Sequence, residues 1–131
     1  ESQFRQSIMN VLIVEDEQQI VSVLQNKFTQ EGFTVAVAKN GQEGLALAVK
    51  EHPDIILLNI IMPVMDGMAM LTELRKYVWG KTAQVILLTN LSDPDKVSES
   101  VAQGITEYLI KSDWKLEDLV AKVKEKIAEK G

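Results

Sequence analysis

The sequence predicts a doubly wound α/β domain, in which a parallel sheet of five strands carries helices on both faces. Five short apolar runs alternate with helical patterns, at Val11–Val14, Thr34–Ala38, Ile55–Leu58, Val85–Leu88 and Tyr108–Ile110. Four of these runs are unbroken rather than alternating, which is typical of strands buried on both faces of a parallel sheet. The short connections favour right-handed crossovers, and these build a doubly wound sheet.

Apolar periodicity predicts amphipathic helices between and after these runs. Ile20, Leu24 and Phe28 recur every four residues and give the first helix one apolar stripe. The last helix has the i, i+3, i+4, i+7 pattern. Its apolar positions are Leu116, Leu119, Val120, Val123 and Ile127. The second apolar run, at residues 34–38, is lighter than the others, so we expect it at an edge of the sheet.

Capping residues indicate where helices begin and end. Asn40 followed by Glu43 is a capping box, because the two side chains can satisfy each other's free backbone N–H groups. Further predicted starts are Asp66-Gly67, Asp93-Pro94 and Asp113. Glycines favour helix ends, and the predicted ends are Gly32, Gly80 and Gly104.

Composition excludes several classes of function. The 131 residues, 46% of them apolar and 25% charged, suit one domain with a real core. Because 14 Lys and Arg face 19 Asp and Glu, the net charge of -5 argues against a nucleic-acid partner. The absence of cysteine and the single histidine exclude disulfides and a zinc centre. No apolar run approaches the roughly 20 residues that span a bilayer, and no signal peptide is evident, so we expect a cytoplasmic protein without membrane contact.

Polar side chains follow four of the predicted strands. They are Glu15 and Asp16 after the first strand, Asn59 after the third, Thr89 after the fourth and Lys111 after the fifth. Ligands of open parallel sheets bind beyond the carboxyl ends of the strands. We therefore expect these side chains to converge on one rim.

The chemistry of this set fits the handling of a phosphoryl group. The carboxylates of Glu15 and Asp16 are hard oxygen ligands that suit Mg²⁺. Thr89 can donate a hydrogen bond to a phosphoryl oxygen, and Lys111 can neutralise its charge. A carboxylate at position 59 could attack phosphorus, but the neutral amide of Asn59 is a very poor nucleophile. The set thus predicts a magnesium-dependent phosphoryl site that lacks its nucleophile.

Through these residues, the sequence resembles the receiver domains of bacterial response regulators, including the stand-alone chemotaxis type. The resemblance extends from Met9 to about Glu129 and rests on four segments, Leu12–Glu17, Pro53–Gly67, Leu88–Asn90 and Tyr108–Lys111. It implies a (βα)5 receiver domain over residues 9–131 with the flavodoxin-like strand order 2-1-3-4-5. Residues 1–8 are then either a native arm or a remnant added for expression.

The resemblance implies a role for each residue around the predicted acceptor. Glu15 and Asp16 match the metal-binding acid pair, and Ile61 would lend its backbone carbonyl to the same Mg²⁺. Asn59 lies where the family has its phosphoacceptor aspartate, which is also a metal ligand. As an asparagine it is inactive as an acceptor.

The resemblance also implies a switch and a partner face. Thr89 matches the switch hydroxyl, Lys111 the phosphate-binding lysine, and Tyr108 the aromatic residue that reorients upon phosphorylation. Ser112 follows the lysine where the family often has proline, which relaxes this loop. Tyr108 and Trp114 are expected on the partner face, where an exposed tryptophan is a common anchor. Partial burial of Trp114 in the core is the alternative.

We interpret the chain as a signalling switch and not as an enzyme. A sensor histidine kinase or phosphotransfer protein would supply the phosphoryl group, an unknown output protein would bind, and homodimerisation remains open. Asn59 is either a substitution in a working receiver, which we favour, or the mark of a natural pseudo-receiver that acts as a phosphate-independent scaffold. A phosphatase with an aspartyl nucleophile and a nucleotide or flavin binder are weaker alternatives, because neither an aspartyl nucleophile nor a glycine-rich loop directly follows the first strand.

Overall fold

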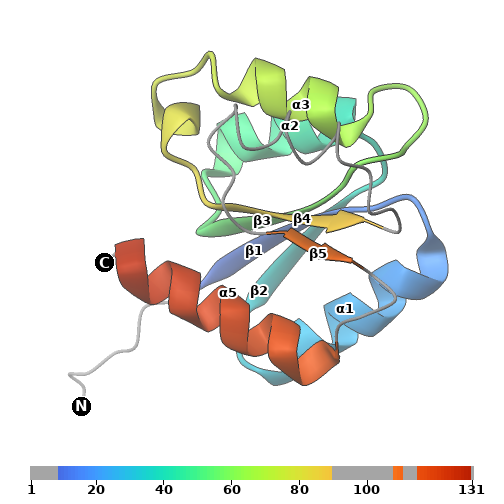
Figure 1. Cartoon of the computed structure of the whole chain (residues 1–131), viewed down its shortest axis with the longest axis vertical. Coiled ribbons are helices and arrows are strands. Elements are labelled where there is room, and N and C mark those ends of the chain that lie inside the picture. The colour runs from blue at the N-terminus through green and yellow to red at the C-terminus, as the bar shows by residue number, and fades with distance from the viewer. Residues whose placement is uncertain (1–8, 90–107, 111–114, 131) are drawn as a thin grey trace.

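The computed structural model describes residues 9–89, 108–110 and 115–130 (Figure 1). Five parallel strands form one sheet in the order β2-β1-β3-β4-β5. The strands are β1 (Asn10–Val14), β2 (Thr34–Ala38), β3 (Ile55–Asn59), β4 (Val85–Thr89) and β5 (Tyr108–Ile110). The predicted order is thereby confirmed for strands 2-1-3-4, with the lighter strand β2 at the edge, and β5 continues the sheet beside β4.

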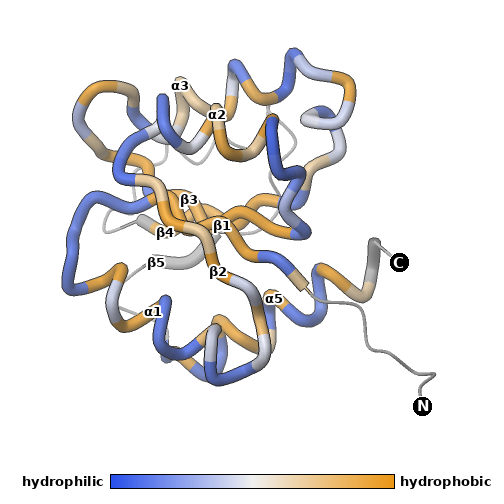
Figure 2. The backbone as a smooth tube through the Cα atoms, turned by 180° about the vertical axis from the view of Figure 1, so that it is seen from behind, coloured by the Kyte–Doolittle hydropathy of each residue, from blue (hydrophilic) through white to orange (hydrophobic). Residues whose placement is uncertain are grey.

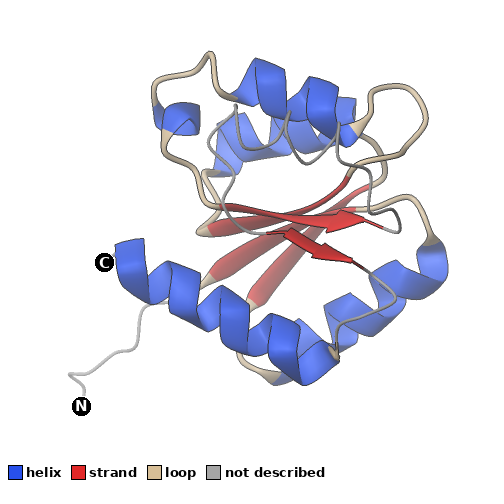
Figure 3. Cartoon of the chain, viewed as in Figure 1, coloured by secondary structure: helices blue, strands red, loops and turns tan. Residues whose placement is uncertain are grey.

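Helices cover both faces of this sheet, as the doubly wound prediction requires (Figure 3). They are α1 (Gln18–Gln30), α2 (Gly41–Glu51), α3 (Gly67–Leu74) and α5 (Leu116–Lys130), with a short 3-10 helix η2 (Trp79–Lys81) before β4. Helices α2 and α3 lie on one face, and α1 and α5 lie on the other. The predicted helix start at Asp93-Pro94, the start at Asp113 and the end at Gly104 lie outside the described residues.

The alternation of side chains along the strands divides the core into two layers. Leu12 and Val14 of β1 pack in the cluster beneath α2 and α3, whereas Val11 and Ile13 pack in the cluster beneath α1 and α5. All residues of β3 are buried. Figure 2 shows the resulting apolar centre, with hydrophilic segments gathered on the outer parts of the helices. Burial of both sheet faces explains why the strand sequences are unbroken apolar runs.

Two predicted helix starts are confirmed by side-chain caps. Asn40 Oδ1 accepts a hydrogen bond from the backbone N–H of Glu43 at 2.9 Å, at the start of α2. In a capping box, the Glu43 carboxylate would accept from the N–H of Asn40. Here it accepts instead from the N–H of the preceding residue, Lys39, at 3.1 Å. Asp66 Oδ1 accepts from the N–H of Ala69 at 2.8 Å and caps α3.

The prediction that a helix ends at Gly80 is wrong. Helix α3 ends at Leu74, and Gly80 lies within η2. The guanidinium of Arg75 donates to the carbonyl oxygens of Gly80 and Ala83 at 2.6 and 3.0 Å, and this organises the connection to β4. A Cβ atom at Gly80 would collide with the carbonyl oxygen of Leu74, so the glycine is required by a close approach and not by a helix end.

Candidate functional site

The sheet register places Glu15 beside Asn59 at the carboxyl ends of the strands. Val14 pairs with Leu58, so the next residue of each strand emerges at the same edge. The backbone N–H of Glu15 donates to the carbonyl oxygen of Ala38 at 3.0 Å, which fixes this segment against β2. Two polar side chains from segments 44 residues apart thus meet at the rim.

The side-chain amide of Asn59 is the centre of the site. Its Nδ2 lies 3.1 Å from Glu15 Oε2, 3.2 Å from Asp16 Oδ1 and 3.0 Å from the backbone carbonyl oxygen of Ile61. An amide NH₂ group has only two hydrogens. Three oxygens therefore share two donors at Asn59.

Burial differs sharply between the two acids. Glu15 is 1% exposed and Asn59 is 6% exposed, whereas Asp16 is exposed to solvent. A buried carboxylate needs hydrogen bonds to offset its lost hydration. Glu15 Oε2 accepts one from Asn59 and another from the backbone N–H of Glu17 at 3.1 Å. The inner acid is consequently fixed in position, and the outer acid faces water.

The connection from β3 to α3 presses the helix start against the site. The N–H of Gly67 donates to the carbonyl oxygen of Ile60 at 2.7 Å. A Cβ atom at Gly67 would collide with the carbonyl oxygen of Asn59 and would lie 2.9 Å from the Cα of Ile60. The glycine is therefore needed for this close approach.

The same connection contains a strained residue. Val64 has φ 71°, in the left-handed region, and the residue is 76% exposed. A β-branched residue rarely adopts this conformation, which costs about 1–2 kcal/mol. Ile61 also exposes its side chain while its carbonyl oxygen faces Asn59.

The structure brings together four of the predicted site residues, and they are Glu15, Asp16, Asn59 and the backbone of Ile61. Thr89 ends β4 one position beyond the Asn59–Leu88 pair, so its backbone reaches the same edge. Tyr108 is the first residue of β5 and therefore lies at the amino end of that strand. The side chains of Thr89 and Tyr108, and all of Lys111 and Trp114, lie outside the described part of the chain.

Sequence reasoning missed two features of the site. The direction of the Asn59 amide cannot be predicted from the sequence, because it depends on oxygens supplied by two other segments. The left-handed backbone at Val64 is equally hidden, since valine is not a residue that signals such a turn. The Pro63 before it and the Asp66-Gly67 start after it gave the only signal that a tight connection lay there.

The oxygens of the site fit Mg²⁺ better than a transition metal. Within the described residues, no group of three or more His, Cys, Asp or Glu side chains could hold a metal ion. The donors present at the rim are two carboxylates and a backbone carbonyl. Mg²⁺ prefers such hard oxygens and keeps several waters, so it requires few protein ligands.

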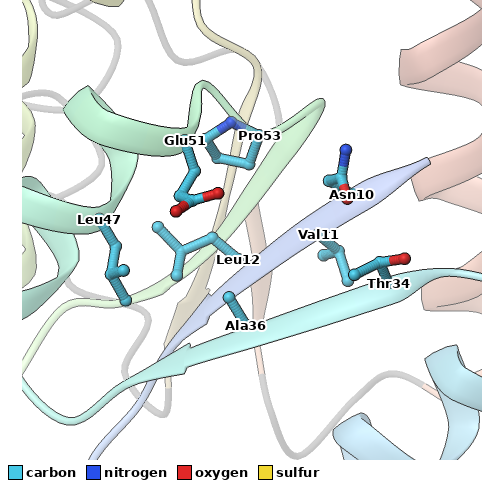
Figure 4. A pocket seen from close by; sticks show the side chains of 8 residues that line it. All are labelled: Asn10, Val11, Leu12, Thr34, Ala36, Leu47, Glu51 and Pro53. Carbon is cyan, nitrogen blue, oxygen red and sulfur yellow. The ribbon is translucent and has the colours of Figure 1, made fainter. Parts of the chain in front are cut away.

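A cavity of about 100 Å³ lies at the opposite end of the sheet (Figure 4). Its walls come from β1, β2 and the end of α2, and the lining includes Asn10, Thr34, Leu47 and Glu51. The cavity is therefore separate from the rim that holds Asn59. Among the helices of the described ranges, none is both long and apolar enough to cross a membrane.

The chain belongs to the response regulator receiver domain family, whose pattern matches residues 11–124. It is 34% identical to the uncharacterized transcriptional regulatory protein YkoG of Bacillus subtilis over 122 residues, which cover 93% of this chain and 52% of YkoG. The chain thus spans about half the length of that relative. Residues 11–14 of β1 and the site described above lie within the matched range.

Solved structures agree with this assignment. The chemotaxis protein CheY4 of Vibrio cholerae is 29% identical with a TM-score of 0.84, and the match covers 91% of this chain and 98% of CheY4. A chain of the CheX–CheY–BeF3–Mg²⁺ complex of Borrelia burgdorferi is also 29% identical, with a TM-score of 0.80 and coverage of 89% and 87%. The chain is therefore a two-component receiver domain in both sequence and fold.

Proposed function

We propose that this chain is a phosphorelay receiver, a Mg²⁺-dependent phosphoryl acceptor switch that controls partner binding and is blocked by Asn59 at the acceptor position. The observation that carries this proposal is the contact of the Asn59 amide with both rim acids and with the carbonyl of Ile61. An aspartate in the same place would present a carboxylate to the same oxygens. That carboxylate would therefore need a cation between it and the rim oxygens, and phosphoryl transfer commonly depends on such a metal ion.

The proposed metal ligands are Glu15, Asp16 and the carbonyl of Ile61, with position 59 completing the set. A chain of similar fold occurs in the Borrelia complex, which contains Mg²⁺ and BeF3, and this supports a Mg²⁺-dependent function for the fold. When bound, Mg²⁺ would neutralise the charge that collects on the phosphoryl oxygens. Glu15 would hold its carboxylate fixed through the N–H of Glu17, while exposed Asp16 would face the entering ion.

The block follows from the chemistry of the amide. In a version with aspartate at 59, a carboxylate oxygen would form the bond to phosphorus while the bond between phosphorus and a donor imidazole nitrogen breaks. The lone pair of the Asn59 nitrogen is delocalised into the carbonyl, and both of its hydrogens point at acceptors. Asn59 therefore presents donors where a nucleophile is required.

The remaining predicted roles complete the switch. Thr89 would donate a hydrogen bond to a phosphoryl oxygen, and Lys111 would neutralise the charge of that group. Tyr108 would reorient upon phosphorylation. Trp114 and Tyr108 would belong to the partner face. The switch would act by shifting an equilibrium between two existing conformations.

The proposed partners are a sensor histidine kinase or phosphotransfer protein on the input side and an output protein on the other. Residues 9–131 would form the receiver domain. The relative YkoG is named as a transcriptional regulatory protein and is about twice as long as the matched region. An output through nucleic acid therefore belongs among the candidates for a longer protein, although the charge of this chain opposes direct binding.

A natural pseudo-receiver is the second candidate function. It is favoured by the good fit of the amide, since Asn59 is buried and its nitrogen lies within hydrogen-bond distance of three oxygens. Such a protein would bind its partner without phosphate. Conversion of Asn59 to aspartate would then leave partner binding unchanged.

Intact mass separates these two candidates. The chain and its Asn59→Asp variant are incubated with Mg²⁺ and a small phosphodonor, and each is weighed. We expect only Asn59→Asp to gain a phosphoryl group. Asn26→Asp makes the same chemical change at an exposed position of α1 and should gain nothing. If Asn59→Asp also gains nothing, the pocket has lost its chemistry and the scaffold is the better account.

A further inference from the structure

The amide nitrogen of Asn59 stands where the rim oxygens converge. Its three neighbours come from two segments, namely Glu15 and Asp16 directly after β1 and Ile61 in the connection after β3. The three distances differ by only 0.2 Å, between 3.0 and 3.2 Å. A single positively polarised group is therefore surrounded by oxygens in the manner of a bound cation.

We propose that the NH₂ group of Asn59 is a built-in substitute for the metal ion, which holds the rim in its assembled, metal-free arrangement. This inference rests on the proposed function for the identity of the cation site. It adds that the asparagine does more than remove a nucleophile. The same residue removes the need for the cation.

The charge at the rim explains why a substitute is useful. Glu15 is buried, and Asp16 approaches the same nitrogen from the solvent side. Carboxylates held together in a poorly hydrated place repel each other unless a positive group lies between them. The hydrogens of the Asn59 amide carry partial positive charge, and they lie toward both acids.

The geometry also explains why Mg²⁺ should displace the substitute with difficulty. Mg²⁺ requires oxygens at about 2.0–2.1 Å, whereas the nitrogen holds them at 3.0–3.2 Å. The oxygens would have to move inward, and the amide would have to turn so that its carbonyl oxygen replaces its nitrogen. Binding of the cation would thus begin with the loss of hydrogen bonds to three oxygens.

Aspartate at position 59 should reverse this situation. An ionised carboxylate has acceptors only, so three negative groups would face one another around a position that is 6% exposed in the parent chain. The metal-free fold should then lose stability, and Mg²⁺ should restore it. Stability that depends on Mg²⁺ is consequently expected for the variant and not for the chain as it stands.

Thermal unfolding in a metal chelator and in millimolar Mg²⁺ tests this proposal. In chelator we expect Asn59→Asp to lower Tm by about 4 °C or more, and Mg²⁺ should recover most of that loss. The Tm of the parent chain should be the same in both buffers. Asn26→Asp adds the same charge at an exposed position of α1 and should behave like the parent.

The side-chain amide signals of Asn59 provide a second measurement that does not depend on a variant's stability. These NMR signals can be assigned by residue-selective labelling, and we expect them to stay in place as Mg²⁺ is added. The proposal is overturned if Mg²⁺ shifts them strongly at low concentration. It is also overturned if Asn59→Asp matches the parent Tm in chelator, or if Mg²⁺ raises the parent Tm as much as that of the variant.

The two proposals fail in different measurements. If Asn59→Asp gains no phosphoryl group but loses stability without Mg²⁺, the proposed switch fails and the amide substitute stands. If it gains the phosphoryl group but is equally stable in chelator, the switch stands and the substitute fails.

Discussion

The two ends of the sheet hold acidic side chains by different means. At the carboxyl ends of the strands, Glu15 is buried and accepts hydrogen bonds from the neutral N–H groups of Asn59 and Glu17. At the amino ends, Glu31 is only partly covered and pairs with Lys27 of α1 at 3.3 Å and with Lys124 of α5 at 3.0 Å. The first arrangement is shielded from salt, and the second is open to screening.

The difference shows where this fold tolerates strain and close approach. The rim combines one buried acid, a left-handed valine and a glycine pressed against a strand end. At the opposite end, the carboxylate of Asp54 accepts a hydrogen bond from the backbone N–H of Asn10 at 2.7 Å. Strain also occurs away from the rim, since His52 at the end of α2 has φ 47°. At the rim, the strained Val64 and the tightly packed Gly67 lie in the same connection as Ile61, and such features are often found at sites of function.

The largest effect on stability is expected from glycine substitutions that compare the two ends. Gly67→Ala should lower the free energy of unfolding by about 3 kcal/mol, because the new Cβ collides with the carbonyl oxygen of Asn59. Gly32→Ala should lower it by only about 1 kcal/mol, since its Cβ meets nothing within 4 Å and only φ +93° is strained. Urea unfolding measures both, and equal losses would contradict the close packing of the rim.

Magnesium affinity gives the next largest effect. Asn59→Asp should bind Mg²⁺ at least about tenfold more tightly than the parent, which corresponds to about 1.4 kcal/mol. The reason is that a carboxylate replaces hydrogen-bond donors among Glu15, Asp16 and the carbonyl of Ile61. Isothermal titration calorimetry measures the affinity, with Asn26→Asp as the matched control. Equal or tighter binding by the parent would exclude position 59 as a metal ligand.

A smaller effect of opposite sign, a gain in stability, is expected from relieving the backbone strain at Val64. Val64→Asn should raise the free energy of unfolding by about 1 kcal/mol, because asparagine tolerates the left-handed conformation that Val64 adopts. Val78 is 87% exposed and has φ -57°, so Val78→Asn should change stability by less than about 0.5 kcal/mol. Chemical unfolding of both variants checks the pair, and equal changes would show that exposure and not strain matters.

The smallest effect concerns the ion pairs at the amino ends. The hydrogen bond from Lys124, together with that from Lys27, lowers the pKa of Glu31 below its ordinary value of 4.5. Because the folded-state pKa is depressed, its contribution to stability is present above pH 4.5 and is lost as the pH falls through the lower folded-state value. The Tm difference between the parent and Glu31→Gln should therefore shrink in acid, and high salt should reduce it at neutral pH. A difference that is constant with pH would exclude this linkage.

Much of the fold could be predicted because each element carries its own signal. Unbroken apolar runs identified the strands, and the caps at Asn40 and Asp66 identified two helix starts. Gly80 was misread, because a glycine required by a neighbouring carbonyl oxygen cannot be distinguished in sequence from one that ends a helix. Glu15, Asp16 and Asn59 could be named because parallel strands deliver their ends to one edge, whereas the carbonyl of Ile61 was expected only from the resemblance to receiver domains.

By itself, the sequence determined the alternation of strands and helices, the amide at position 59 and the pair of acids after the first strand. These depend on residue type and spacing, which are local. Only the tertiary structure decided that the Asn59 nitrogen faces three oxygens, that Glu15 is buried while Asp16 is exposed, and that Val64 is strained. Those features arise from groups that are distant in the chain, and the packing of the sheet and the β3–α3 connection fixes their distances and directions.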